Sequence, residues 1–386
     1  MTATPPILTE EPEERQRPLT EDVAPARGAT VQLLRIGAAL VVPVLAFFAL
    51  TVTFNFLRDA DANRVLIVAV AIVVGVAGVW ALFYGMDKLL NLAPERIQAG
   101  VRPFVFVGPA LVILSVFLVY PAVSTTLLAF QDRTSETFVG LDNFVAIFTN
   151  SDTLVSIRNS IAWVIVVPVV AVAVGLGFAT LADKLGRRAE NAAKSVIFLP
   201  MAISFVGASI VWRFVYSFRP PGFGEQIGLL NGIMAGFGRE PVNWLLSEPW
   251  NNVFLMVVLI WLQTGFAMVI LSAAIKSVPD DILEAARIDG AAEWQVFWRV
   301  VFPSIASTVV VVLTTIVITV WKVFDIVFVM TGGNFGTSVV AERMITEFFT
   351  FRNSGQGAAL AVILFIAVIP VMIINVRRFR AQEAMR

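Results

Sequence analysis

The chain has 386 residues and a formal net charge of zero; 58% of its residues are hydrophobic and 15% are charged. A soluble domain carries closer to about a quarter charged residues, so much of this surface is expected to face lipid. The absence of Cys and His excludes disulfides, thiolate chemistry and histidine-based metal sites, and the balanced charge gives no indication of nucleic-acid binding.

The N-terminal segment, residues 1–30, is rich in Pro, Glu, Thr and Ala. It shows no apolar periodicity, and no apolar core follows a short basic start. We therefore expect a disordered cytoplasmic tail and not a cleaved signal peptide.

Eight windows are long and apolar enough to cross a hydrocarbon core of about 30 Å, which takes roughly 20 helical residues. They lie near residues 36–56, 65–86, 104–126, 161–181, 196–216, 252–275, 304–326 and 357–376. Backbone amides in lipid must be paired within their own segment, so each window is predicted to be a helix. The predicted fold is all-α and polytopic, with a two-span hairpin and polar linker in residues 31–100 and a six-span core in residues 101–380.

The distribution of Lys and Arg predicts that both termini lie in the cytoplasm. In that orientation, well over half of the 28 basic residues fall on the inner side. The short loop DKLGRRAENAAK and the C-terminal RRFR segment are the clearest cases. Both termini on one side require an even number of spans, in agreement with eight.

The loop between the sixth and seventh windows, residues 277–303, carries the most information. Pro279 suits a first helical turn and Ser277 is a candidate cap, while Asp289-Gly290 is a turn signal that ends this helix. A second helix with one apolar face is predicted after the turn, because its apolar residues are spaced i, i+3, i+4, i+7: Trp294, Phe297, Trp298 and Val301.

The first of these two helices has the chemistry of a docking element. Ala285 and Ala286 are small, so a partner can approach closely, and Glu284 supplies a charge for a Lys or Arg across the contact. A surface amphipathic helix resting on lipid headgroups fits the same residues equally well. From these residues alone, both interpretations stay open.

A resemblance to a known family favours docking. The residues EAA at 284–286, G at 290 and VxFP at 300–303 resemble the EAA loop of ABC-importer permeases, which reads EAA, x3, G, x9, I-x-L-P. The segments FVGLDNFVAIF and FDIVFVMTGG look similar to maltose-type sugar permeases of the same superfamily, and the likeness covers roughly residues 100–380. The eight-span layout resembles the larger permease subunit, and the end of the chain looks similar to α-glucoside and trehalose permeases.

The resemblance implies a permease subunit of an ATP-driven importer in the bacterial inner membrane, surrounded by membrane lipids. An extracytoplasmic binding protein would deliver an α-glucoside, maltose or trehalose-type sugar to this chain and a second permease subunit. An ATPase homodimer would bind ATP and Mg²⁺ and would receive the EAA loop in a groove, at these residues: Glu284, Ala285, Ala286, Asp289 and Gly290. The chain has no Gly-Lys dipeptide and hence no P-loop, so we expect no cofactor, metal or catalytic residue in it.

Polar residues at mid-membrane depth are the candidates for the sugar path. Gln263 and Ser204 lie near the middle of their windows, whereas Thr314 and Thr315 are expected to make only helix–helix hydrogen bonds. The sugar-lining positions of the maltose permease, carried over from the EAA motif, fall on nearby residues, and Trp321 offers an aromatic face. The expected lining residues are Met201, Ser204, Phe205, Leu262, Gln263, Phe266, Ile316, Thr319, Val320 and Trp321.

Three charged residues near the outer ends of the spans are expected to be structural. Arg213 would reach the membrane interface, and Lys322 and Asp325 would pair on one helix. Two other functions stay open. An ion-coupled secondary transporter would usually need ionisable residues at mid-membrane, and a membrane scaffold would need no substrate path.

Overall fold

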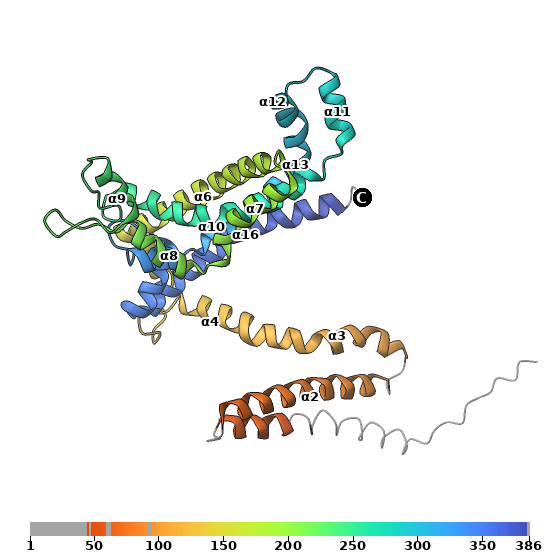
Figure 1. The fold of residues 1–386 in the computed structure, drawn as a ribbon. Coiled ribbons are helices and arrows are strands. Elements are labelled where there is room, and N and C mark those ends of the chain that lie inside the picture. The colour runs from red at the N-terminus through yellow and green to blue at the C-terminus, as the bar shows by residue number, and fades with distance from the viewer. Residues whose placement is uncertain (1–44, 46–47, 59–62, 92–94, 384–386) are drawn as a thin grey trace, which may run out of the picture. The chain divides into compact units, whose positions relative to one another are not determined.

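The computed structural model describes residues 45, 48–58, 63–91 and 95–383. Within these residues the regular structure is helical, apart from one isolated bridge between Gln131 and Phe138. The chain divides into two compact units, Met1–Val119 and Tyr120–Arg386 (Figure 1). The predicted tail, residues 1–30, lies outside the described residues. The boundary expected at residue 100 stays a prediction.

The first unit contains α2 (Arg64–Leu90), α3 (Glu95–Leu114) and the π-helix η1 (Ser115–Val119), after a helical stretch at residues 48–58. The side chain of Asn63 accepts a hydrogen bond from the Val65 amide at the start of α2. Stacked rings of Phe83 and Phe106, 6.2 Å apart, join α2 to α3. Glu95 starts a helix inside the segment predicted as a polar linker.

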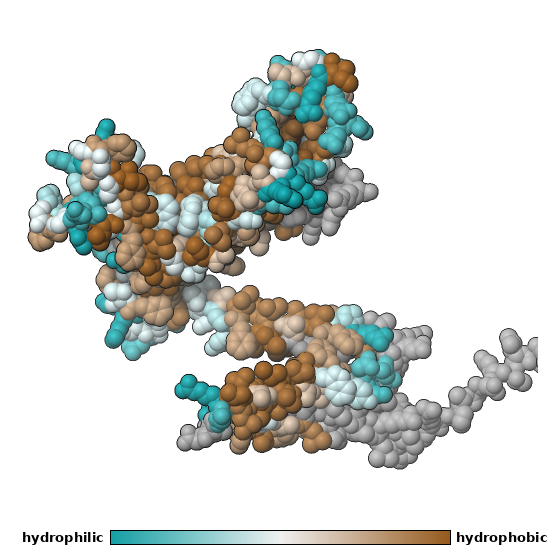
Figure 2. All heavy atoms as spheres, viewed as in Figure 1, coloured by the Kyte–Doolittle hydropathy of each residue, from teal (hydrophilic) through white to brown (hydrophobic). Residues whose placement is uncertain are grey.

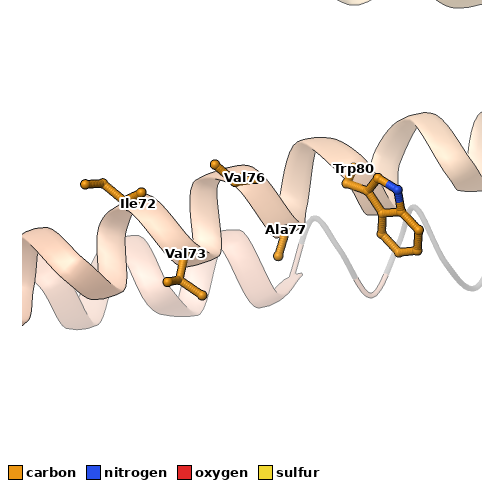
Figure 3. A pocket seen from close by; sticks show the side chains of 5 residues that line it. All are labelled: Ile72, Val73, Val76, Ala77 and Trp80. Carbon is orange, nitrogen blue, oxygen red and sulfur yellow. The ribbon is translucent and has the colours of Figure 1, made fainter.

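A shallow apolar groove of about 440 Å³ runs along α2. Its five lining residues follow one side of the helix (Figure 3): Ile72, Val73, Val76, Ala77 and Trp80. Apart from the Trp80 indole, these side chains offer only hydrocarbon. The groove suits lipid acyl chains and lacks the polar groups that a sugar site needs.

The second unit holds the remaining helices, in chain order: α4 (Tyr120–Leu128), α5 (Asp142–Thr149), α6 (Ser151–Asp183), α7 (Arg187–Phe198), η2 (Leu199–Ala202), α8 (Phe205–Val215), α9 (Leu229–Gly236), α10 (Trp250–Lys276), α11 (Asp280–Ile288), α12 (Glu293–Val296), η3 (Phe297–Val301), α13 (Phe302–Trp321), α14 (Asp325–Met330), α15 (Val340–Ile345), η4 (Thr346–Thr350) and α16 (Ser354–Glu383). Within this unit, α11 and α12 lie at one end and α9 lies at the opposite end (Figure 1). The surface between these ends is largely apolar (Figure 2), as lipid contact requires.

The core of the second unit is the packing of α6, α10 and α13. Trp163, Leu259 and Ile316, one from each helix, are fully buried there. The approach of α6 to α10 depends on Gly175, because a Cβ at this position would lie 2.6 Å from the Cβ of Ala267. Close helix contact at small residues is the usual way for membrane helices to associate, since lipid removes most of the hydrophobic driving force.

Six helices among the described residues are long and apolar enough to cross a membrane, or seven if one bent pair counts as a span. These account for all the predicted windows except 36–56, most of which lies outside the described residues. The count of eight therefore stays a prediction. The spans are Arg64–Lys88, Ala110–Leu128, Ser151–Asp183, Trp250–Lys276, Glu293–Trp321 and Ser354–Arg377, with the bent pair Arg187–Ala202 and Phe205–Val215.

The bent pair corrects the prediction of one continuous helix at residues 196–216. The chain bends by 103° between Ala202 and Phe205. Ile203 and Ser204 adopt extended backbone conformations, and the Ser204 side chain accepts a hydrogen bond from the Gly207 amide, 3.1 Å away. Ser204 is therefore the N-cap of α8 and not a residue inside a helix.

Candidate functional site

The first candidate site is the helical elbow at residues 280–296, formed by α11, a turn and α12. The turn predicted at Asp289-Gly290 is present. Gly290 has φ +81°, and its amide donates to the Arg287 carbonyl at 3.0 Å. The Ala291 amide donates to the Ala286 carbonyl at 3.1 Å. These two bonds form a Schellman motif, which needs a left-handed residue at the Gly290 position.

Two details of the elbow differ from the prediction. Ser277 does not cap α11, because its hydroxyl donates to the Ala274 carbonyl, 2.7 Å away at the end of α10. The α11 helix begins without a side-chain cap and carries Asp280 and Asp281 in its first turn, where negative charge is favourable. The second helix does not end before Pro303, because α12, η3 and α13 form one span.

An ion pair links the two helices of the elbow. The Nε atom of Arg287 donates to Oε1 of Glu293 at 2.9 Å, across the turn from α11 to α12. This contact with the Glu293 carboxylate raises the pKa of Arg287 above its usual value. Because both side chains are well exposed, water screens the pair, and its main effect is on orientation.

The α11 helix contains no buried residue. Glu284 and Ala285 are exposed and Ala286 is half-buried, so the three motif residues are accessible to a partner. Ile288 is 85% exposed and Trp294 is 71% exposed. At this exposure, both apolar side chains are available for contact with a partner or with the lipid interface. The motif did not identify Ile288, although it lies directly beside Asp289.

The second candidate site is the set of expected lining residues, which come from three parts of the bundle. The α10 helix contributes Leu262, Gln263 and Phe266, and it packs against η2, α8 and α13, the elements that hold the other residues. Leu262, Gln263, Ile316 and Val320 are buried, Phe205, Phe266, Thr319 and Trp321 are half-buried, and Met201 and Ser204 are exposed. The centre of this set is therefore α10.

Gln263 differs from the other polar residues of this set. It is 8% exposed, and no hydrogen bond to its side-chain amide is present among the described residues. The hydroxyl of Thr319 donates to the Thr315 carbonyl at 3.1 Å, and Ser204 is used as the α8 cap. The side-chain N and O atoms of Gln263 are not among the buried atoms that lack a partner, so the amide keeps access to its surroundings. Because it can both donate and accept, it is the polar group of this set that is most available to an external partner.

The structure also tests the residues that were expected to be structural. Thr314 and Thr315 donate to carbonyls of their own helix at 2.8 Å and not to another helix. Arg213 donates to the Val329 carbonyl of α14 at 3.3 Å. The predicted pair of Lys322 and Asp325 is wrong: no ion pair joins them among the described residues, because α13 ends at Trp321 and α14 starts at Asp325.

Comparisons with known proteins give a consistent result. Residues 171–381 match the family model described as binding-protein-dependent transport system inner membrane component. The osmoprotective compounds uptake permease protein GgtC of Synechocystis sp. is 56% identical over 281 residues, which are 73% of this chain and 100% of that protein. The alpha-glucoside transport system permease protein AglF of Rhizobium meliloti is 47% identical over 283 residues, 73% of this chain and 83% of the relative.

A solved structure matches the fold. It is the crystal structure of a bacterial alginate ABC transporter in complex with an alginate pentasaccharide-bound periplasmic protein. The TM-score is 0.63 at 19% sequence identity, and the match covers 72% of this chain and 96% of that chain. At this identity the match shows the fold alone.

Proposed function

The chain belongs to the binding-protein-dependent transport system inner membrane components, and from this premise we propose how it performs sugar import. It is the permease subunit of an ATP-driven sugar importer. The elbow at residues 280–296 receives a partner ATPase, which binds and hydrolyses ATP with Mg²⁺. Gln263 and the residues around it contact the sugar.

The docking role is supported by the exposure of the elbow and by its well-defined turn. Gly290 sets the turn and the Arg287–Glu293 pair links the two helices, so the ATPase meets a surface that is already folded. A preformed surface avoids the cost of ordering flexible side chains and loops on binding. Lipid headgroups, the alternative contact for this helix, would not require a fixed turn.

A neutral sugar of the α-glucoside, maltose or trehalose type is the substrate that the lining residues support best. None of the ten lining residues carries a charge, so an acidic sugar would find no counter-ion there. The amide of Gln263 can both donate to and accept from sugar hydroxyls. Phe266 and Trp321 supply apolar faces of the kind that pack on a sugar ring.

The remaining partners follow from the family. A second permease subunit completes the path, an ATPase homodimer drives it, and an extracytoplasmic binding protein delivers the sugar. The chain lies in the bacterial inner membrane as a multi-span protein, with both termini in the cytoplasm. Neither an ion-coupled transporter nor a scaffold has comparable support.

The test is the ATPase activity of the complete complex, reconstituted in proteoliposomes with its binding protein. Neutral α-glucosides, maltose and trehalose are each added and ATP hydrolysis is measured. At least one is expected to stimulate hydrolysis and to accumulate in the lumen, while an acidic oligosaccharide does neither. Stimulation by the acidic sugar alone would refute the proposed substrate class.

A further inference from the structure

A buried carboxylate joins α7 to α10 at the end of the second unit that carries the elbow. Glu190 of α7 is 6% exposed. Its carboxylate accepts hydrogen bonds from Lys194 of the same helix and from Lys276, the last residue of α10, whose Nζ lies 2.7 Å from Oε1 and 2.8 Å from Oε2. Asp183 at the end of α6 lies 3.9 Å from the same ammonium. Three helices therefore meet at Lys276.

The place of Lys276 gives this cluster a connection to the docking site. Only Ser277, Val278 and Pro279 separate it from α11, so the bridge lies at the base of the elbow. Sequence reasoning used the loop DKLGRRAENAAK only as an orientation signal and did not identify Glu190. The available signal was the spacing of Glu190 and Lys194, one helical turn apart.

The opposite end of α7 is also held against α10, by its backbone. A Cβ at Gly265 would lie 2.5 Å from the Ile197 carbonyl oxygen and 2.8 Å from the Phe198 Cα. Beyond Phe198 follow η2 and the break at Ser204, and Gln263 lies two positions from Gly265 along α10. The α7 helix thus runs antiparallel to α10 and connects the base of the elbow to the candidate sugar site.

We propose that Glu190 is a positioning residue for transport. Its bridge to Lys276 makes α7 move together with the base of the elbow. When the docked ATPase displaces the elbow, the bridge transfers this displacement to α7, and α7 moves the break between η2 and α8. Met201 and Phe205 at the break would shift with it. This inference rests on the proposed function.

The two lysines differ in a way that makes the proposal testable. Lys194 and Glu190 belong to one helix, so their contact balances charge but cannot link helices. Lys276 makes the only hydrogen bond to Glu190 that comes from another helix among the described residues. If the carboxylate needs only charge balance, the two lysines are equivalent. If the carboxylate transfers motion between helices, only the loss of Lys276 lowers the amount of sugar imported per ATP hydrolysed.

The experiment compares K276M with K194M in the complete complex, as sugar molecules imported per ATP hydrolysed in proteoliposomes. K276M is expected to lower this ratio about three- to tenfold, the range for one partly exposed charge-assisted hydrogen bond. K194M, the matched control, is expected to stay within about twofold of the parent, because it leaves the bridge in place. K276R restores the bridging charge and is expected to restore the ratio.

A second variant covers the case in which K276M does not assemble. This chain has no Cys, so Glu190→Cys with Lys276→Cys introduces its only two thiols, and the complete complex with the parent chain is the control for thiols of the partners. The number of sugar molecules imported per ATP hydrolysed is expected to be low in this variant. It is expected to recover when a flexible bifunctional thiol reagent joins the two positions. No recovery, or loss of the remaining uptake on crosslinking, would overturn the proposal.

The outcomes separate the bridge from the function on which it rests. A normal parent complex with equal ratios for K276M and K194M refutes the bridge and leaves the importer function standing. A parent complex that binds no ATPase and imports no sugar refutes both.

Discussion

The turn at Gly290 allows a prediction whose magnitude follows from the structure. With φ at +81°, an L-residue at this position adopts a left-handed conformation, which costs roughly 1–2 kcal/mol. A Cβ there would meet open space within 4 Å, so G290A carries the backbone cost alone. Asn tolerates the left-handed region, and G290N is expected to cost less. G290P cannot reach this φ and also loses the amide that donates to Arg287.

The assay is the affinity of the purified ATPase for the permease complex in nanodiscs. If the full backbone cost appears in docking, G290A weakens binding about five- to thirtyfold, because about 1.4 kcal/mol corresponds to tenfold. G290N is expected to weaken binding less than G290A. G290P is expected to weaken binding more than about a hundredfold, from a cost of about 3 kcal/mol or more.

The matched control is Gly186, in the loop between α6 and α7. Its φ is −63° and a Cβ there also meets open space, so G186A should leave ATPase affinity unchanged. If G290A and G290P bind the ATPase as the parent does, the turn is not part of the docking surface. If G186A weakens binding as much as G290A, the effect is not specific to the elbow.

Two further predictions concern the bundle. Gln263→Ala is expected to lower uptake at low sugar concentration about three- to tenfold, the cost of one sugar hydrogen bond, with normal assembly. Its control is Thr315→Ala, whose hydroxyl bonds within its own helix. Gly175→Val is expected to lower the thermal midpoint of the detergent-solubilised protein by several degrees, because the new side chain would overlap Ala267. Gly177→Ala, at a position with open space, is its control.

Each of these predictions has a result that contradicts it. Unchanged uptake in the Gln263 variant, or an equal loss in the Thr315 variant, would show that Gln263 does not contact sugar. A Gly175 variant as stable as the Gly177 variant would show that the close approach of α6 to α10 is not required.

The bounds of a span were predictable where the apolar run extends over nearly the whole helix. The window at 252–275 matches α10, Trp250–Lys276, almost to the residue. The window at 161–181 misses ten residues at the start of α6. These residues include Asn159, whose side chain donates to the Gly336 and Ser338 carbonyls at 2.7 and 2.9 Å. A hydropathy window cannot include a polar turn that is stabilised by contacts with a loop far along the chain.

The two candidate sites also differ in whether local sequence or contacts between distant segments determine them. The turn of the elbow depends on local signals, a Gly at a fixed distance from small residues, so the sequence predicts it. The burial and hydrogen bonding of the Gln263 side chain depend on which helices surround it. Hydropathy indicates how deep a residue lies in the membrane but not which neighbouring helix its side chain faces. Glu190 was missed for the same reason, since its partner Lys276 lies 86 positions away.

The break at Ser204 supports the sugar path independently of Gln263. It lies near the middle of the window at 196–216, where backbone amides and carbonyls outside a helix would face hydrocarbon. Non-helical backbone at that depth is tolerated only where it is buried in protein or lines a water-filled cavity. Met201 and Ser204 are exposed at the break, so the described residues of the second unit do not cover it. We therefore expect a second permease subunit or a hydrated path to border the break, and a hydrated path would agree with the proposed sugar route beside Ser204.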